Sequence, residues 1–259
     1  MSEDLLYEIK DGIGRMTFNR PQARNAFTFE MYERLAEICQ QAEKDPSVRV
    51  LVLTGAGEKA FASGTDISQF PAFSTPEDAL QYEGRIDRVL GALERCPVPT
   101  IAAIAGACIG GGFGVASCCD LRICAANARF GFPVGRTLGN CLSGATCARL
   151  AALLGPALVK DIVFTARLMD AAEAREIGLV SEVLPDHAAL QSRADDLART
   201  VASLAPLTLR ATKEALRRIK EKTVPGDDHD LILMCYMSND FREGMDAFLN
   251  KRSPKWTGT

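Results

Sequence analysis

The segment Ile109 to Gly114, which holds three consecutive glycines, constrains the fold of this chain more than any other feature. The apolar stretch Pro97 to Ala105 before it is typical of a buried strand, and the small residues Val115 to Cys119 after it can begin a helix. Consecutive glycines let the backbone turn sharply and let a ligand approach its N–H groups closely. We therefore expect a tight loop between a strand and a helix that can contact a ligand.

A second loop of this kind, Phe61 to Ile67, ends another apolar run earlier in the chain. Either loop alone is more often an ordinary connection between a strand and a helix. Two such loops together can direct two backbone N–H donors at one oxygen atom, which makes an oxyanion hole.

Composition is that of a globular protein and disfavours several other classes. The 259 residues are enough for one large domain, or one domain with a small appendage, and 47% of them are hydrophobic and 24% charged. A net charge of -3 argues against binding to nucleic acid or to an acidic membrane surface. No apolar run is long enough to span a membrane.

Cysteine usage points to a reducing compartment. The 9 cysteines form no C-x-x-C pair and only 2 histidines accompany them, so we expect no metal site. The acidic N-terminal residues Met1 to Asp4 do not resemble a signal peptide. An odd number of cysteines without such a signal favours free thiols and a cytoplasmic location.

Hydrophobic patterning predicts alternating strands and helices, which indicates an α/β protein with right-handed βαβ units. The expected strands cover residues 7–10, 15–18, 48–53 and 120–125, and the expected helices cover residues 28–43 and 77–95.

Capping residues and prolines predict where several helices begin and end. Thr28 is the expected N-cap of the first helix, and Asp170 with Glu173 is expected to form a capping box before a helix that Gly178 ends. The pattern from about Pro185 onward is almost entirely helical. The chain is interrupted at Pro71 to Thr75, and its last part is divided at Pro206 and at Pro225-Gly226.

Many segments, in order and spacing, resemble the crotonase superfamily, the enoyl-CoA hydratase/isomerase family, over almost the whole chain. They are Ile13 to Pro21, Asn25-Ala26, Val50 to Gly55, Ala60 to Ile67, Pro99 to Gly106, the triple glycine, Cys119 to Arg122, Glu173-Ala174, Gly178 to Val180, Arg242 to Met245, Phe248-Leu249 and Lys251-Arg252.

The resemblance implies a crotonase fold, a spiral of ββα repeats followed by a C-terminal helical region that forms trimers. It implies an acyl-CoA-binding core over residues 1–195 and a helical trimerisation region over residues 196–259. The expected partners are an acyl-CoA thioester and further copies of the chain, as a homotrimer or a dimer of trimers.

The resemblance also assigns the oxyanion hole to the backbone N–H groups of Thr65 and Gly111. Coenzyme A then enters as part of the substrate, and no separately bound cofactor is expected. When an acyl thioester becomes an enolate, charge moves onto its oxygen, and losing one preset N–H donor costs roughly 3 kcal/mol.

By the same resemblance, coenzyme A is expected near Ala23 and Arg24 and along Ala62, Ser63, Asp66, Ile67 and Ser68. Asp66 could be a catalytic acid, but an N-cap for a helix starting near Ile67 is the favoured interpretation. Lys251 matches a lysine that reaches the CoA phosphates from a neighbouring subunit, and a solvated lysine at a helix end is an equal alternative.

Two positions depart from the family pattern. Family hydratases use two glutamates, one to hold a water molecule and one to transfer a proton. The matching positions hold Gly114 and Val134, and neither residue can transfer a proton. The sequence therefore argues against the usual hydratase mechanism and against isomerases that use the second glutamate.

Other candidates for the acyl pocket come from a polar loop and from a helix. The polar loop, Gly135 to Ser143, supplies Arg136, Asn140, Cys141 and Ser143. Cys141 is a conceivable nucleophile. A loop that only shapes the pocket is the commoner case. The expected helix at residues 77–95 supplies Glu83 and Asp87, although acids on an amphipathic helix are usually exposed. His187 and His229 are expected at the surface.

The sequence thus predicts an enoyl-CoA hydratase/isomerase-like enzyme that acts on an acyl-CoA thioester through an enolate, with atypical proton-transfer groups. One alternative is a homologue that binds acyl-CoA without catalysis. Another is a thioester hydrolase or lyase that uses residues of the polar loop.

Overall fold

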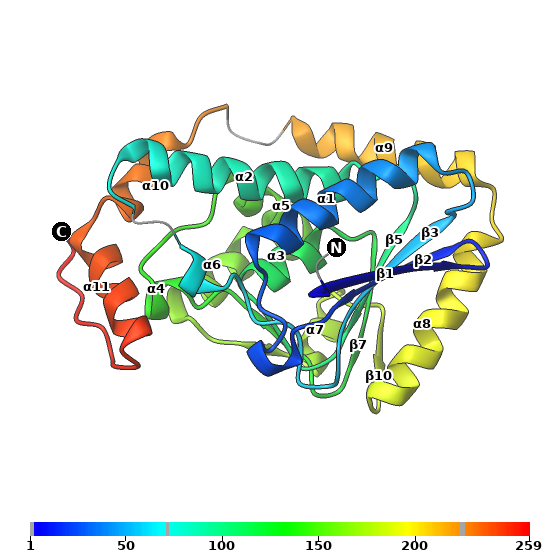
Figure 1. Ribbon diagram of the computed structural model, residues 1–259, viewed down its shortest axis with the longest axis horizontal. Helices are drawn as coiled ribbons and strands as arrows, with labels where there is room; N and C mark the ends of the chain where they lie inside the picture. The colour runs from blue at the N-terminus through cyan, green and yellow to red at the C-terminus, as the bar shows by residue number, and fades with distance from the viewer. Residues whose placement is uncertain (1–2, 71–72, 223–225) are drawn as a thin grey trace.

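Two β-sheets form the centre of the fold in the computed structural model, which describes residues 3–70, 73–222 and 226–259 (Figure 1). In spatial order, the larger sheet holds β1 (Leu5–Lys10), β2 (Ile13–Phe18), β3 (Val50–Gly55), β5 (Thr100–Ile104), β7 (Leu121–Ala125) and β10 (Glu182–Leu184). The smaller sheet holds β4 (Ala60–Ala62), β6 (Ala107–Ile109), β8 (Arg129–Gly131) and β9 (Met169–Asp170).

The chain alternates between the two sheets, and this alternation produces the expected ββα spiral. Strands β3, β5 and β7 pair in parallel in the larger sheet, and the strands that follow them, β4, β6 and β8, pair in parallel in the smaller one. Helix α2 (Pro76–Glu94) follows β4, and α3 (Gly111–Cys118) follows β6. The predicted α/β architecture is confirmed.

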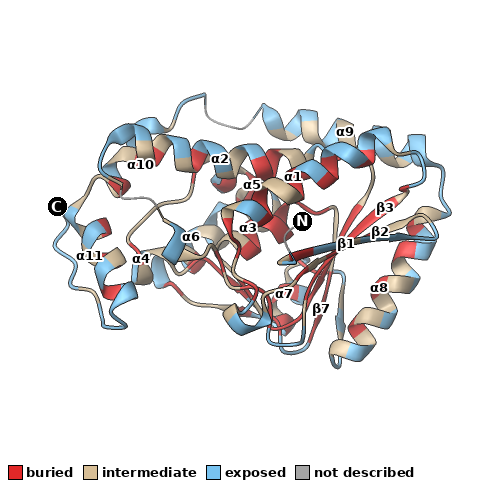
Figure 2. Cartoon of the chain, viewed as in Figure 1, coloured by how far each residue is buried: buried red, intermediate tan, exposed pale blue. Residues whose placement is uncertain are grey.

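Strand β3 is buried on both faces, as its unbroken apolar sequence predicts. Leu51 and Leu53 pack into the main core, which includes α1 (Phe29–Lys44). Val50 and Val52 face the opposite layer, which α8 (His187–Ala202) covers (Figure 2). Because side chains alternate along a strand, one apolar run supplies two hydrophobic layers.

The C-terminal helices return to the first half of the chain. Helix α10 (His229–Tyr236) packs along α2 (Figure 1). Residues of α2, α10 and α11 (Asn239–Leu249) share one apolar cluster. The expected boundary between the acyl-CoA-binding core and the C-terminal region, after residue 195, falls inside helix α8. This division into two regions stays a prediction. The other helices are α4 (Val134–Thr137), α5 (Gly144–Leu154), α6 (Pro156–Thr165), α7 (Ala171–Glu176) and α9 (Pro206–Glu221).

The two predicted helix N-caps, Thr28 and Asp170, are confirmed. The Thr28 side chain accepts a hydrogen bond from Met31 N (3.2 Å) at the start of α1, and Asp170 accepts one from Glu173 N (2.9 Å) at the start of α7. The expected capping box at Asp170 is wrong in its second half, because the Glu173 carboxylate instead pairs with Arg167.

The interruptions expected at Pro71 and at Pro225 lie outside the described residues. Within the described ranges, no helix has both the length and the apolar character needed to cross a membrane.

The two glycine loops touch each other, and glycine is required where they meet. Gly64 and Gly110 have φ angles of 114° and 54°, a region that favours glycine. A methyl group added to Gly110 would lie 3.5 Å from Gly64 Cα, and one added to Gly112 would lie 2.2 Å from the carbonyl oxygen of Ala62. The N-terminus of α3 can therefore reach the first loop only because it lacks side chains.

Replacing Gly112 with alanine is expected to destabilise the protein by about 1–3 kcal/mol, because the backbone of Ala62 must move to admit the new methyl group. The matched control is Gly114→Ala in the same helix, where the methyl group would lie 3.5 Å from Leu90 Cδ1, an ordinary contact. Since alanine favours helix over glycine, this control is expected to be neutral or stabilising. Denaturant unfolding measures both, and equal effects would contradict the close contact.

Candidate active site

A cavity of about 210 Å³ lies between the two glycine loops and α2. Thr65 and Gly111 line it from the two loops, Glu83 lines it from α2, and Phe248 lines it from α11. Residues of the N-terminal repeats and of the C-terminal helices therefore line the same cavity.

The backbone at Thr65 and Gly111 has the properties that an oxyanion hole needs. Within the described residues, neither of these N–H groups donates to another group, although the neighbouring Asp66 and Gly110 N–H groups bond to carbonyl oxygens. Gly111 is the first residue of α3, so its N–H also lies at the positive end of the helix dipole. The expected pair of free donors is thus present in one cavity.

The side-chain hydroxyl of Thr65 contacts the hydroxyl groups of two tyrosines. Its hydroxyl lies 3.0 Å from the Tyr32 hydroxyl and 3.4 Å from the Tyr82 hydroxyl. Burial raises the pKa of both phenols, so both stay protonated near neutral pH. The Thr65 side chain is therefore held by the protein, and its backbone N–H is the group left for a ligand.

Glu83, one of the candidates for the acyl pocket, lines this cavity and is buried, although acids on an amphipathic helix are usually exposed. Its side chain is covered because α10 packs on α2, and only 7% of the residue is exposed. The Tyr236 hydroxyl donates a hydrogen bond to Glu83 Oε1. Burial raises the pKa of Glu83 to about 7, although the bond from Tyr236 opposes the shift, and the nearby Asp87 and Asp228 carboxylates add to it.

A signal for this burial was present in the sequence. Glu83 lies on the apolar stripe of α2 that Ala79, Ile86, Leu90 and Leu93 form at helical spacing. A single acid within such a stripe must be buried with a partner or exposed by a break in packing.

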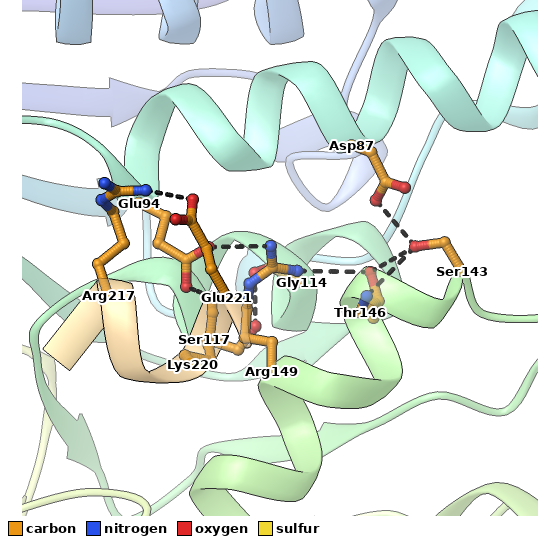
Figure 3. A network of polar contacts seen from close by, with 10 residues as sticks. All are labelled: Asp87, Glu94, Gly114, Ser117, Ser143, Thr146, Arg149, Arg217, Lys220 and Glu221. Carbon is orange, nitrogen blue, oxygen red and sulfur yellow. Dashed lines mark hydrogen bonds and ion pairs between the residues drawn. The ribbon is translucent and has the colours of Figure 1, made fainter. Parts of the chain in front are cut away.

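Asp87 lies one turn further along α2 but does not line the cavity. It accepts a hydrogen bond from the Ser143 hydroxyl (2.8 Å), and Ser143 caps α5 by accepting from Thr146 N. Figure 3 shows this network continuing through Thr146 and Arg149 toward Glu94. Asp87 therefore belongs to a structural network that anchors α5 to α2.

The positions where the family resemblance expects glutamates, Gly114 and Val134, both line the cavity. Neither side chain ionises. In the described part of the chain, Glu83 is the only aspartate or glutamate among the lining residues.

The polar loop divides between two hollows. Asn140, Cys141 and Ser143 line the cavity, whereas Arg136 lines a neighbouring hollow beside Phe164 and Trp256. A hydrogen bond with Cys235, together with burial, raises the pKa of the Cys141 thiol well above its usual value. Cys141 is therefore not a ready nucleophile.

The structure places some, but not all, of the residues expected near coenzyme A beside one another or in the cavity. Ser63 N donates to the Arg24 carbonyl oxygen (3.1 Å), and the Ser63 hydroxyl lies 3.5 Å from the carbonyl oxygen of Ala23. Ser63 and Ile67 line the cavity, but Ala62, Asp66 and Ser68 do not.

Asp66 has the structural role that was favoured for it. It accepts hydrogen bonds from the backbone and the hydroxyl of Ser68, which caps the short 3-10 helix Ile67–Gln69, and it pairs with Arg20 (2.8 Å). Lys251 is exposed just after α11 and does not line the cavity. The two histidines lie outside the cavity as well.

Comparison with known proteins agrees with this geometry. A profile of the enoyl-CoA hydratase/isomerase family matches residues 8–259. The chain belongs to this family. The short-chain-enoyl-CoA hydratase of Clostridium acetobutylicum is 33% identical over 258 residues, which cover 96% of this chain and 95% of that protein.

Solved structures of the enoyl-CoA hydratase/isomerase family have the same fold. An enoyl-CoA hydratase/carnithine racemase from Magnetospirillum magneticum matches with a TM-score of 0.81 and 33% identity, over 100% of this chain and 97% of that one. An enoyl-CoA hydratase/isomerase from Pseudoalteromonas atlantica matches with a TM-score of 0.86 and 28% identity, over 98% of this chain and 100% of that one. The crotonase fold is thereby confirmed.

The raised pKa of Glu83 predicts how the Glu83→Gln variant changes stability with pH. The native state binds the Glu83 proton more tightly than the unfolded state, so its contribution to stability falls as pH rises from about 4.5 to about 7. Above that range Glu83→Gln is expected to be more stable than the parent by up to about 3 kcal/mol. Urea unfolding at pH 8 and near pH 4.5 measures this difference, which should shrink at the lower pH. A variant destabilised equally at both values would contradict the buried acid.

Proposed function

We propose that this protein is an acyl-CoA enzyme that forms an enolate, with Glu83 as its proton-transfer group. The observation that carries the proposal is one buried carboxyl group in the same cavity as the free N–H groups of Thr65 and Gly111. A pKa of about 7 lets Glu83 both accept and donate a proton near neutral pH.

The proposed step balances without a cofactor. The bond between the α-carbon and its hydrogen breaks, and the proton moves to the ionised Glu83 carboxylate. The electron pair moves into the enolate, whose oxygen accepts hydrogen bonds from the two N–H groups. Return of the proton from Glu83 to the α-carbon regenerates the thioester, and its delivery to the γ-carbon of an unsaturated chain shifts the double bond.

A single carboxyl group favours proton shifts over hydration. One acid can remove a proton from one carbon and return it to another, whereas hydration also needs a group that holds the water molecule. Since Glu83 is the only acid among the described lining residues, crotonyl-CoA hydration is expected to be at least ~10²-fold slower than with two cooperating carboxylates.

The direct test is exchange of the α-hydrogens of butyryl-CoA with solvent in D₂O, followed by mass spectrometry. The parent protein is expected to exchange them at a rate that rises as pH passes about 7, because the carboxylate is the base. Glu83→Gln is expected to slow exchange at least ~10²-fold and, because Gln is isosteric, to bind butyryl-CoA with similar affinity in calorimetry.

Other outcomes distinguish the alternative functions. Binding without exchange in the parent protein would identify an acyl-CoA-binding homologue without catalysis. Release of free coenzyme A would identify a thioester hydrolase. Unchanged exchange in Glu83→Gln would reject Glu83 as the base, and absence of binding at millimolar butyryl-CoA would reject acyl-CoA as the ligand class.

We also propose that the protein assembles as a trimer or a dimer of trimers. Large apolar side chains are exposed on α9, where Leu207 and Ile219 are 77% and 64% exposed, and on α6, where Phe164 is 81% exposed. These side chains are where we expect further copies of the chain to pack, since exposed apolar surface can mark a protein–protein contact. Light scattering at micromolar concentration is expected to give three or six times the monomer mass, and a monomer would contradict the assembly.

A further inference from the structure

Tyr236 links the C-terminal helices to the acid in the cavity. Its side chain, on the last residue of α10, is fully buried and its hydroxyl donates to Glu83 Oε1. No described group hydrogen-bonds to Glu83 Oε2. One oxygen of the carboxyl group is thus held by the protein, and the other is left for a ligand in the cavity.

Asn140 fixes the direction of the Tyr236 hydroxyl. Its Nδ2 lies 3.4 Å from the phenol oxygen, and an amide N–H can only donate. The phenol therefore accepts from Asn140 and keeps its own hydrogen for Glu83. This chain of donors runs in one direction, from the polar loop through α10 to α2, and each bond strengthens the next.

The ring of Tyr236 is fixed independently of its hydroxyl. It packs at 5.1 Å between ring centroids from Phe73 and at 4.7 Å from Phe241. Removing the hydroxyl alone therefore leaves the aromatic packing in place, which makes Tyr236→Phe a clean test of the hydrogen bond.

We infer that Tyr236 is a positioning residue, which holds one oxygen of the Glu83 carboxyl group and thereby presents the other to the α-carbon of the acyl chain. This inference rests on the proposed function. It goes further in giving a residue of the C-terminal region, outside both glycine loops, a defined part in proton transfer.

The hydrogen bond also sets the acidity of Glu83. A donated hydrogen bond favours the charged carboxylate, so Tyr236 lowers the pKa of Glu83 against the larger effect of burial. The other titratable groups around this carboxyl are Tyr32 from α1, Tyr82 and Asp87 from α2, Asp228 before α10, and Cys141 from the polar loop. None of these groups donates a hydrogen bond to Glu83 in the described structure. Among them and Tyr236, only Tyr236 therefore lowers the pKa of Glu83 through a hydrogen bond.

The experiment measures α-hydrogen exchange of butyryl-CoA in D₂O against pH for Tyr236→Phe. Loss of the hydrogen bond raises the pKa of Glu83, so the rising limb of the profile is expected to move to higher pH by about one unit. The plateau at high pH is expected to fall about tenfold, because the carboxylate is no longer held in one orientation. The KM for butyryl-CoA is expected to change little.

Tyr82→Phe is the matched control. Tyr82 is also a buried phenol of this cavity, but its hydroxyl lies beside Thr65 and not on Glu83. This variant is expected to leave the midpoint of the pH profile in place. Asn140→Ala, which removes the donor to Tyr236, is expected to move the midpoint in the same direction as Tyr236→Phe but by less.

The outcomes separate this inference from the proposed function. If Glu83→Gln abolishes exchange and Tyr236→Phe shifts neither midpoint nor plateau, the positioning role is wrong and the base assignment stands. If Glu83→Gln retains exchange, both are wrong. A lower plateau with an unmoved midpoint, accompanied by a lower melting temperature, would assign Tyr236 a role in stability alone. In that case Asn140→Ala would leave the midpoint unmoved as well.

Discussion

The close contact between the two glycine loops is the constraint on which the rest of the site depends. In the proposed oxyanion hole, one loop supplies Thr65 N–H and the other supplies the first N–H of α3 to the same oxygen. Gly112 lies so close to the Ala62 carbonyl group that no side chain fits between them. Sheet pairing supplies this proximity, because β4 and β6, which precede the loops, are parallel neighbours in the smaller sheet. The positions of both donors are thus fixed before any ligand binds.

The acid is positioned by a different part of the fold. Glu83 lies on the apolar stripe of α2, where α10 covers it and Tyr236 supplies a hydrogen bond. Burial of an acid in this way opposes folding at neutral pH by an amount on the order of 3 kcal/mol, and the same burial raises its pKa into the range useful for proton transfer. Stability given up at a reactive group in this manner is typical of active sites.

Hydrophobic patterning predicted the α/β class, whereas the resemblance to the enoyl-CoA hydratase/isomerase family supplied the crotonase fold and the donors Thr65 and Gly111. Two glycine loops after apolar runs indicated two N–H donors near one oxygen, which stays a prediction, and the apolar residues of β3 predicted a strand buried on both faces, which is confirmed. Glu83 was a pocket candidate and lies on the apolar stripe of α2, but its hydrogen-bond partner could not be predicted, because Tyr236 of α10 lies about 150 residues later in the chain. The position of Arg136 in a separate hollow likewise depends on the packing of α6 against the polar loop. Side chains whose surroundings come from distant segments are those that local reasoning cannot place.

A crystal structure with butyryl-CoA bound tests most directly the claim that this cavity holds an enolate oxygen beside a buried acid. The thioester oxygen is expected to lie about 2.7–3.1 Å from both Thr65 N and Gly111 N. Glu83 Oε2, and not Oε1, is expected to be the carboxyl oxygen nearest the α-carbon. A thioester bound away from the two loops, or an α-carbon with no carboxyl group beside it, would contradict the account.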